Sequence, residues 1–480
     1  MKLTKRIIAG AVAVLSAFSV VGCGKEDGKK DSGSDAVPLS EQQQQIIEDL
    51  ANSDVLPATD LSNKEINWFG HYAINPKDGK AASPDIELFK TKYGGTIKDN
   101  VTTWDNRYND LAKLVIAGTA PDFFQADDMD TFPKGAIRGM FQPIDDYIDF
   151  DSDLWKDVKT AADSFVFQDK HYVALIEVQP NYVCVYNRAT IAAEGFDDPA
   201  ELFAKGEWTI DKFFEMCSEF VDPSEEKYAL DGYWYDEAIQ QTTGIPLIAL
   251  ENGEIISNLG SAEVAAIEER MYQEQKKGIV FPRKDNNWKT RGSGANGEGL
   301  GDGKTLFIPI GLWGIQGTPE EIKLFGDVTE NEIMFVPMPD NTDNEPYYVS
   351  ARVNGYVLCT GAPNPEGFTA YMNCKRACAL DEKVQGIGDE QLANVYGWNQ
   401  EMIDMKDTVY EMVREHPVFE FYNGVTEELA SLFNNTISAG VMTEGDEGAS
   451  TWTELLGENK GAVDYMVKEA NAEISEKPTL

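Results

Sequence analysis

The chain has 480 residues, of which 82 are Asp or Glu and 41 are Lys or Arg, so its formal net charge at pH 7 is −41. Such an acidic molecule lacks the basic footprint that nucleic acid or an anionic lipid surface requires, so neither surface is expected as a partner. Hydrophobic residues at 42% and aromatic residues at 11% suffice for more than one core of ordinary size, so we expect two lobes.

The first 22 residues have the three parts of a bacterial export signal. Basic residues precede an apolar run over residues 7–21, which is shorter than the roughly 20 residues that a membrane-spanning helix needs. Gly22 and Cys23 follow, in a pattern that resembles the lipobox of bacterial lipoproteins. We predict that residues 1–22 are a cleaved signal peptide and that Cys23 carries lipid, which places the protein on the extracellular face of the cell membrane. The alternative is a plain secretory signal with an incidental cysteine.

Polar residues dominate the stretch that follows Cys23. Residues 24–36 are almost wholly Gly, Ser, Lys, Asp and Glu, which cannot bury enough apolar surface to offset the entropy of ordering. The composition stays polar to residue 62, although Ile46, Ile47 and Leu50 have helix-like spacing. We predict a lipidated cysteine and flexible linker over residues 23–63, which can include a short helix.

Strands and helices alternate after this linker. Residues 65–72 have the composition of a strand, and residues 84–93 have the apolar spacing of a helix. Residues 109–117 predict a second helix, and residues 120–126 a short buried strand. This alternation indicates a sheet with helical crossovers, which is an α/β architecture.

A strand-like stretch near the middle of the chain is interrupted. Residues 172–176 and 182–187 both have strand composition, and Gln179, Pro180 and Asn181 lie between them. Because Pro cannot donate a ladder hydrogen bond, we predict a hinge at this point.

Three later helices have recognisable first residues. Thr209 is a candidate N-cap for a helix over residues 210–220, and Ser261 for one that ends before Gly278. Asn364 begins an Asn-Pro-Glu sequence, which is typical of a cap, a first-turn proline and a first-turn acid.

The Gly-rich stretch 291–305 contains a G-x-G-x-x-G spacing, at Gly292, Gly294 and Gly297. A dinucleotide-binding fingerprint follows a strand and opens a helix, whereas this stretch follows polar residues and precedes a strand-like segment. The phosphate-loop spacing also fails, because Glu298 stands where a glycine is needed. We predict a mobile surface loop over 291–303 with no nucleotide.

The remaining cysteines indicate neither disulfides nor metal. They are odd in number and lie in scattered apolar contexts, at Cys184, Cys217, Cys359, Cys374 and Cys378. Cys374 and Cys378 are four residues apart, but no His or further Cys accompanies them. We interpret the thiols as small buried hydrophobes and expect no metal or cofactor.

Several motifs together resemble the sugar-type extracellular solute-binding proteins of ABC importers, the group that contains the maltodextrin-binding protein. The motifs are Ala120-Pro121-Asp122, the strand at 182–187, the run 208–213 (WTIDKF), the segment 303–313 (GKTLFIPIGLW) and Asn364-Pro365-Glu366. The resemblance covers residues 64–480. It departs from the family at Ile210, where a second Trp is frequent, and in the long linker before the first strand.

The resemblance implies a periplasmic-binding-protein-like fold, in which two α/β lobes joined by hinge segments close on a ligand like a Venus flytrap. On that pattern the chain crosses between lobes near residues 179–182 and returns near 337–340. The first lobe would comprise residues 64–180 plus 338–385, and the second 181–337 plus 386–480. The family also implies a monomer.

Candidate ligand-binding residues lie in the loops where strands end, because ligands in open α/β sheets bind beyond the carboxyl ends of the strands. They are His71, Tyr72, Gln125, Asp127 and Asp128 in the first lobe, Gln179, Asn181 and Tyr182 at the crossover, and Trp234, Tyr235 and Trp313 in the second lobe. Carboxylates and amides can engage vicinal hydroxyls, and rings cover the apolar face of a sugar. Trp313 is the strongest candidate, since the family usually places a stacking aromatic there.

These features predict a lipid-anchored solute-binding protein, and not an enzyme, that delivers a carbohydrate, favoured as an oligosaccharide, to an ABC transporter permease. A polyamine or a peptide is the alternative solute, because an acidic, aromatic cleft also suits cations. A secreted glycoside-acting enzyme is the other alternative, but adjacent Asp127 and Asp128 would point in different directions and do not form a carboxylate pair.

Overall fold

The computed structural model describes residues 36–127, 129–282, 297–341, 346–438, 440–442 and 449–476. The predicted signal peptide, the lipidation site Cys23, the candidate Asp128 and the first part of the Gly-rich stretch lie outside the described residues. No helix in the described ranges combines the length and apolar character needed to cross a membrane.

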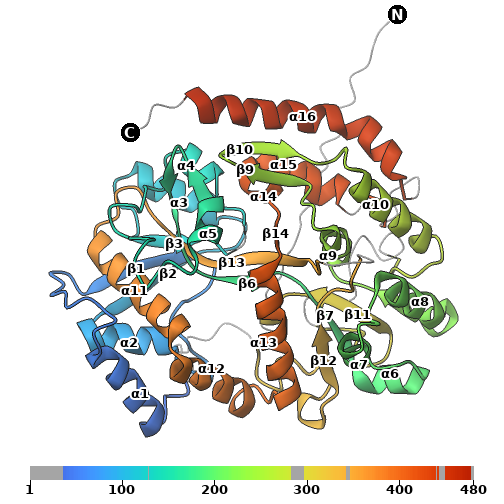
Figure 1. Cartoon of the computed structure of the whole chain (residues 1–480), viewed down its shortest axis with the longest axis horizontal. Coiled ribbons are helices and arrows are strands. Elements are labelled where there is room, and N and C mark those ends of the chain that lie inside the picture. Colours follow the sequence, from blue (N-terminus) through green and yellow to red (C-terminus); the bar gives the residue numbers. More distant parts are fainter. Residues whose placement is uncertain are drawn as a thin grey trace, which may run out of the picture. The chain divides into compact units, whose positions relative to one another are not determined.

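The first sheet has parallel and antiparallel strands in the order β14-β13-β3-β1-β2, with β6 also paired to β13 (Figure 1). Its strands are β1 (Glu65–Gly70), β2 (Thr96–Val101), β3 (Phe123–Gln125), β6 (Val173–Pro180), β13 (Val349–Leu358) and β14 (Pro417–Phe419). The associated helices are α2 (Pro84–Tyr93), α3 (Arg107–Ile116), α11 (Pro365–Leu380) and α12 (Glu382–Asn394). β1 runs parallel to both β2 and β3, so the carboxyl ends of these strands share one edge.

The second sheet has the order β12-β7-β11-β8. Its strands are β7 (Val183–Asn187), β8 (Tyr228–Leu230), β11 (Thr305–Ile310) and β12 (Ile333–Val336). Helices α6 (Arg188–Glu194), α7 (Pro199–Ala204), α8 (Ile210–Phe220), α9 (Tyr235–Gln240) and α10 (Ala262–Gln275) belong to the same part of the chain. Every residue of β7 and β11 is buried, which explains their continuous apolar composition.

The remaining elements are short, apart from two long helices. The short ones are α4 (Lys134–Ile137), α5 (Lys159–Ala162), β4 (Val166–Phe167), β5 (Lys170–His171), β9 (Ile248–Glu251), β10 (Glu254–Ser257), α14 (Tyr422–Val425) and α15 (Glu427–Leu432). The long helix α13 (Gln400–Glu415) packs against β6 and β13 of the first sheet and against β12 of the second (Figure 1). The C-terminal helix α16 (Trp452–Glu476) packs on β10 and α10.

The helix starts predicted from capping residues are confirmed. α8 begins after Thr209, whose hydroxyl accepts a hydrogen bond from the Lys212 N–H at 3.3 Å. α11 begins after Asn364, whose side chain accepts from the Gly367 N–H at 2.9 Å. In both cases a side-chain oxygen satisfies a first-turn N–H that has no partner within the helix.

The crossover between the sheets is shorter than the sequence indicated. β6 continues through Pro180, which pairs with Ala351 at the end of the ladder, so only Asn181 and Tyr182 join β6 to β7. A proline is accommodated there because the last residue of a strand need not donate to its neighbour. The Asn181 N–H donates to the Ser350 carbonyl at 2.8 Å, which fixes the start of the crossover.

The predicted lobe boundaries require two corrections. Asp340 still pairs with the second lobe, since its N–H donates to Trp208 and its carbonyl accepts from Ile210, so the chain returns to the first sheet only after this residue. β14 lies in the first sheet, where parallel pairing with β13 holds it, although residues 386–480 were assigned to the second lobe. A three-residue strand gives no sequence signal of which sheet it joins.

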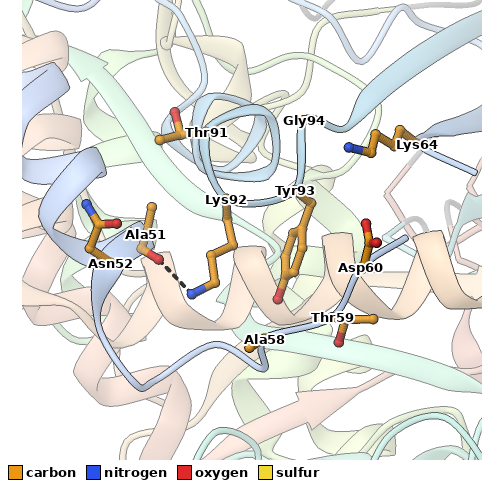
Figure 2. A pocket seen from close by; sticks show the side chains of 10 residues that line it. All are labelled: Ala51, Asn52, Ala58, Thr59, Asp60, Lys64, Thr91, Lys92, Tyr93 and Gly94. Atoms are coloured by element: carbon orange, nitrogen blue, oxygen red, sulfur yellow. Dashed lines mark hydrogen bonds between the residues drawn. The ribbon is translucent and has the colours of Figure 1, made fainter. Parts of the chain in front are cut away.

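The flexible linker predicted to residue 63 is wrong for residues 36–63. Helix α1 (Glu41–Asn52) begins with a capping box, and Ile47 and Leu50 on one of its faces are buried in the core. Lys92 of α2 donates to the Ala51 carbonyl at 2.7 Å, as Figure 2 shows. We call residues 36–63 the N-terminal arm; its apolar stripe packs against α2 and α12, and this burial orders it.

The described part of the Gly-rich stretch is a turn that is partly packed against the core. Leu300 is buried, and the Gly299 carbonyl accepts from the N–H groups of both Lys304 and Thr305. The backbone of Gly297 has a φ of +75°, and a Cβ there would lie 2.4 Å from the Phe325 ring, so only glycine fits. This turn leads directly into β11; Gly297, Gly299 and Leu300 are buried, whereas Gly301 and Asp302 lie at the surface.

Candidate ligand-binding site

The first-lobe candidates meet at the shared edge of β1 and β3. His71 follows β1, Gln125 ends β3, and the His71 Nδ1 lies 2.9 Å from the Gln125 Oε1. The parallel pairing of Trp68 with Phe123 sets this register. The two residues are 54 positions apart in the chain, and the sheet brings them together as predicted.

A ring cluster surrounds His71. The rings of Tyr72 and Trp104 both contact the imidazole edge-on, with centroids 4.9 and 4.7 Å away. Trp104 is 36% exposed, and it was not predicted as a site residue. It follows β2, whose polar sequence (TIKDNV) did not indicate a strand, so the rule that selects strand ends could not find it.

The carboxylate of Asp127 pairs with an arginine that the sequence did not indicate. Its Oδ2 accepts from the Arg352 Nη2 at 2.9 Å, and its Oδ1 accepts no hydrogen bond from the described residues. Burial raises the pKa of Asp127, while Arg352 opposes that shift. The Asp127 Oδ1 is itself buried, so Asp127 fixes Arg352 rather than presenting an accessible oxygen.

A second ion pair lies beside this one. Arg107 bonds to Asp130, and its guanidinium lies 3.4 Å from the Trp104 ring centre. The Tyr108 hydroxyl also donates to Asp130. Each of these two arginines is thus paired with an aspartate, while the nearby Glu177 carboxylate accepts from the amides of Gln179 and Asn354.

His71 adds no charge at neutral pH. Burial and the nearby Arg107 lower the pKa of His71 from 6.5 to about 4. Because Gln125 Oε1 is an acceptor, the contact assigns the ring proton to Nδ1 and leaves Nε2 as an acceptor.

This lowered pKa predicts a pH dependence of stability. Between about pH 6.5 and about pH 4 the unfolded chain protonates His71 while the folded chain does not, so the free energy of unfolding should fall as the pH is lowered through this window. His71→Gln removes this contribution, so its unfolding free energy should fall less steeply. Urea unfolding at several pH values between about 4 and 6.5 measures the free energy of unfolding of wild type and variant. If the two depend on pH in the same way, the lowered pKa of His71 is contradicted.

The second lobe presents three aromatic rings. Trp313 follows β11, Trp234 precedes α9, and their rings meet edge-to-face with centroids 5.8 Å apart. Tyr233 packs on Trp234 in the same way at 5.7 Å. We call these three residues the ring surface, since Trp313 is 40% and Tyr233 is 45% exposed. Tyr235, also predicted as a ligand contact, is only 1% exposed and belongs to the core.

Gly311 places the Trp313 ring beside the crossover. A Cβ at this position would lie 2.3 Å from the Trp313 Nε1 and 3.1 Å from the Asn181 carbonyl oxygen. Only glycine permits this approach, so the GLW sequence orients the indole as well as supplying it.

The crossover candidates have different surroundings. Gln179 donates to the Glu177 carboxylate at 2.8 Å and stands opposite Arg352 in the ladder. Tyr182 is buried, and its hydroxyl donates to Glu237 at 3.1 Å. Gln179 therefore lies near the Asp127 ion pair, whereas Tyr182 is held within the crossover.

A separate pocket lies away from all of these residues. It has a volume of about 610 Å³ and lies between α1 and α2, where Lys64, Lys92 and Asp60 line it (Figure 2). Because the N-terminal arm forms one wall and no predicted site residue lines it, we assign the candidate site to the strand ends instead.

No group of three or more His, Cys, Asp or Glu side chains in the described ranges could hold a metal ion. The five cysteines that the structure describes are buried and unpaired, which confirms their interpretation as small buried hydrophobes.

Comparisons with known proteins identify the family of this chain. The sequence pattern of bacterial extracellular solute-binding proteins matches residues 73–374. The chain belongs to this family. No curated protein matches it in sequence. The family comprises extracellular proteins that bind solutes.

Solved structures agree on the fold of this solute-binding protein. An ABC substrate-binding protein from Listeria monocytogenes in complex with cycloalternan matches with a TM-score of 0.57 and 15% identity, over 86% of this chain and 99% of that chain. A cyclo/maltodextrin-binding protein complexed with maltotetraose has a TM-score of 0.57 and 14% identity, over 86% and 98%. An ABC transporter associated binding protein from B. animalis subsp. lactis Bl-04, in complex with β-1,6-galactobiose, has a TM-score of 0.56 and 16% identity, over 85% and 98%. The predicted two-lobed, periplasmic-binding-protein-like α/β fold is confirmed.

Proposed function

We propose that this solute-binding protein captures a carbohydrate, favoured as an oligosaccharide, between its lobes and delivers it to an ABC transporter permease. The observation that carries the proposal is the ring surface of Tyr233, Trp234 and Trp313. Two of these rings are at least 40% exposed, although large aromatic side chains are usually buried. Exposed rings beside a crossover supply the apolar faces on which sugar rings stack.

The first-lobe face supports a neutral, hydroxyl-rich solute. Asp127 and Asp130 are each paired with an arginine, so neither carboxylate is left as a lone charge. His71 contributes a neutral ring nitrogen. Hydrogen-bonding groups without excess charge suit hydroxyl groups better than they suit an ionic ligand.

The similar solved proteins support the same solute class. Those described above were solved with cycloalternan, maltotetraose and β-1,6-galactobiose, all of which are carbohydrates. A polyamine or a peptide remains the alternative solute, because the chain carries 82 acidic residues against 41 basic ones.

The proposal includes attachment to the outer face of the cell membrane through lipid on Cys23, with the permease as partner. Residues 24–35 would then form the tether, because the N-terminal arm packs on the first lobe from residue 36 onward. Cys23→Ser should release the protein from the membrane fraction, which fractionation of the expressing cells measures. If the variant stays with the membrane, the anchor is elsewhere.

Thermal unfolding of the purified protein against a panel of sugars, polyamines and peptides tests the solute class. A ligand at about 100 times its Kd adds roughly 2.7 kcal/mol to the free energy of unfolding, which raises the midpoint measurably. We expect a rise with an oligosaccharide such as maltotetraose and none with spermidine. A rise with polyamines alone would replace the carbohydrate proposal, and a sugar that is slowly converted to products would indicate an enzyme.

A further inference from the structure

Three chain segments come together at one place. Two of them connect the two sheets, and the third leaves the first sheet. The first is Asn181 and Tyr182, between β6 and β7; the second ends as β13 begins, at Val349 and Ser350. The third is residues 420–422, which follow β14 and lead into α14. We call them the three crossover segments.

One carboxylate receives hydrogen bonds from two of these segments directly. The Glu237 Oε2 accepts from the Tyr182 hydroxyl at 3.1 Å and from the Tyr422 hydroxyl at 2.9 Å. Tyr182 belongs to the first segment and Tyr422 to the third. Both tyrosines are buried, so neither hydroxyl can readily exchange this partner for water.

The remaining segment reaches the same carboxylate through one intermediate side chain. The Glu237 Oε1 accepts from the Gln241 Nε2 at 2.8 Å. Gln241, itself buried, accepts from the Ser350 hydroxyl of the second segment. Since Asn181 also donates to the Ser350 carbonyl, the first and second segments are joined twice.

A second buried glutamate, Glu420, whose pKa burial and Glu237 raise to about 8, reinforces the third segment. Glu420 accepts from the N–H groups of Leu247 and Ile248 at 2.6 and 2.9 Å, which ties residues 420–422 to the start of β9. The Phe421 N–H donates back to the Ile248 carbonyl at 3.0 Å. The third segment is thereby fixed to the chain that follows α9.

Glu237 also lies close in the chain to the ring surface. It is in the first turn of α9, three residues after Trp234 at the cap position. Because α9 is a rigid element, a shift of Glu237 relative to the crossover segments would move Trp234, and with it the Trp313 ring that it contacts.

We propose that Glu237 is the node that holds the three crossover segments together and makes the ring surface move with them when the lobes close. The role in closure rests on the proposed function, whereas the role as a node does not. Both oxygens of the Glu237 carboxyl act as acceptors, for three donors in all, although burial raises its pKa. Glutamine has the same shape but would direct its NH₂ group toward one of three donors.

Distances between spin labels on the two lobes, measured by pulsed electron paramagnetic resonance, test the node. Labels are attached at Lys98→Cys on β2 and Glu219→Cys on α8, both exposed, in a Cys23→Ser background; the cysteines that the structure describes are buried. We expect Glu237→Gln to broaden the distance distribution of the sugar-free protein about twofold, because freed segments populate additional lobe arrangements. Glu254→Gln, an exposed glutamate on β10, is the matched control and should leave it unchanged.

A double variant, Tyr182→Phe with Tyr422→Phe, removes two donors and keeps the carboxylate and both rings. It should broaden the distribution in the same direction, and circular dichroism verifies that each variant is folded. Distributions equal to wild type in folded Glu237→Gln and in the double variant would overturn the node.

The same labels, with maltotetraose as the probe, separate the node from the function. Suppose that maltotetraose shifts the wild-type distance and that Glu237→Gln needs a tenfold higher sugar concentration for the same shift. The population of the arrangement that can close has then fallen about tenfold, and the node is supported. A wild-type response that Glu237→Gln leaves intact overturns the role of Glu237 in closure while the proposed function stands. Broadening in Glu237→Gln without any wild-type response supports the node and counts against this sugar.

Discussion

Trp313→Ala is expected to weaken the binding of the carbohydrate identified by the panel by about 10- to 100-fold, which corresponds to about 1.4 to 2.7 kcal/mol. The indole is 40% exposed, and a sugar ring can stack on an exposed aromatic face. Its orientation is fixed before binding, since Trp234 contacts it edge-to-face and Gly311 permits its close approach to the crossover. A ring ordered in advance loses little entropy when a ligand covers it.

Isothermal titration of wild type and variant with the same sugar measures this loss. Tyr465→Ala is the matched control, because Tyr465 is an aromatic residue on α16 that is 62% exposed and lies outside the candidate site. We expect the control to bind as wild type does. Unchanged affinity in Trp313→Ala would remove the ring surface from the site, and an equal loss in both variants would indicate a general effect on the fold.

The parts of the fold that could be predicted depend on neighbouring residues in the chain. Thr209 and Asn364 cap their helices through first-turn contacts three residues away, so the local sequence contains all of the signal. The capping box of α1 is equally local, but the polar composition around it pointed to a linker. Its order comes from packing on α2 and α12, which the sequence of the arm does not encode by itself.

The candidate site was predictable where it follows from strand order. His71 and Gln125 were expected at adjacent strand ends, and the parallel register of β1 and β3 brings them into contact. Trp104 was missed because β2 is a polar strand. Arg352 lies within β13, and only the long-range pairing of that strand brings it to Asp127.

Glu237 and β14 show a further limit of sequence reasoning. The two tyrosine donors to Glu237 are 55 and 185 positions away in the chain, and no pattern in the sequence links them. β14 has three residues, and its sheet is decided by pairing with β13. Contacts of this kind depend on the assembled fold, so they could not be derived from composition or spacing.

Asp122, in the Ala120-Pro121-Asp122 motif, has a structural role that predicts a large loss of stability on substitution. Its fully buried carboxylate accepts from the backbone N–H of Asn67 at 2.7 Å and from that of Asn364 at 2.6 Å. The Asn67 side chain is a third donor, at 3.0 Å. One side chain therefore joins β1 to the residue that caps α11.

Asp122→Ala should lower the free energy of unfolding by about 3 kcal/mol, since it leaves two buried backbone donors without an acceptor. Urea unfolding measures the change, with Asp54→Ala, an exposed aspartate of the arm, as control. Asp122→Asn should lose less, because one oxygen remains to accept while its NH₂ group faces a donor. Such a loss of stability would mean that the Ala120-Pro121-Asp122 motif joins β1 to α11 and does not serve to contact the ligand. A midpoint of Asp122→Ala equal to that of the control would refute this assignment.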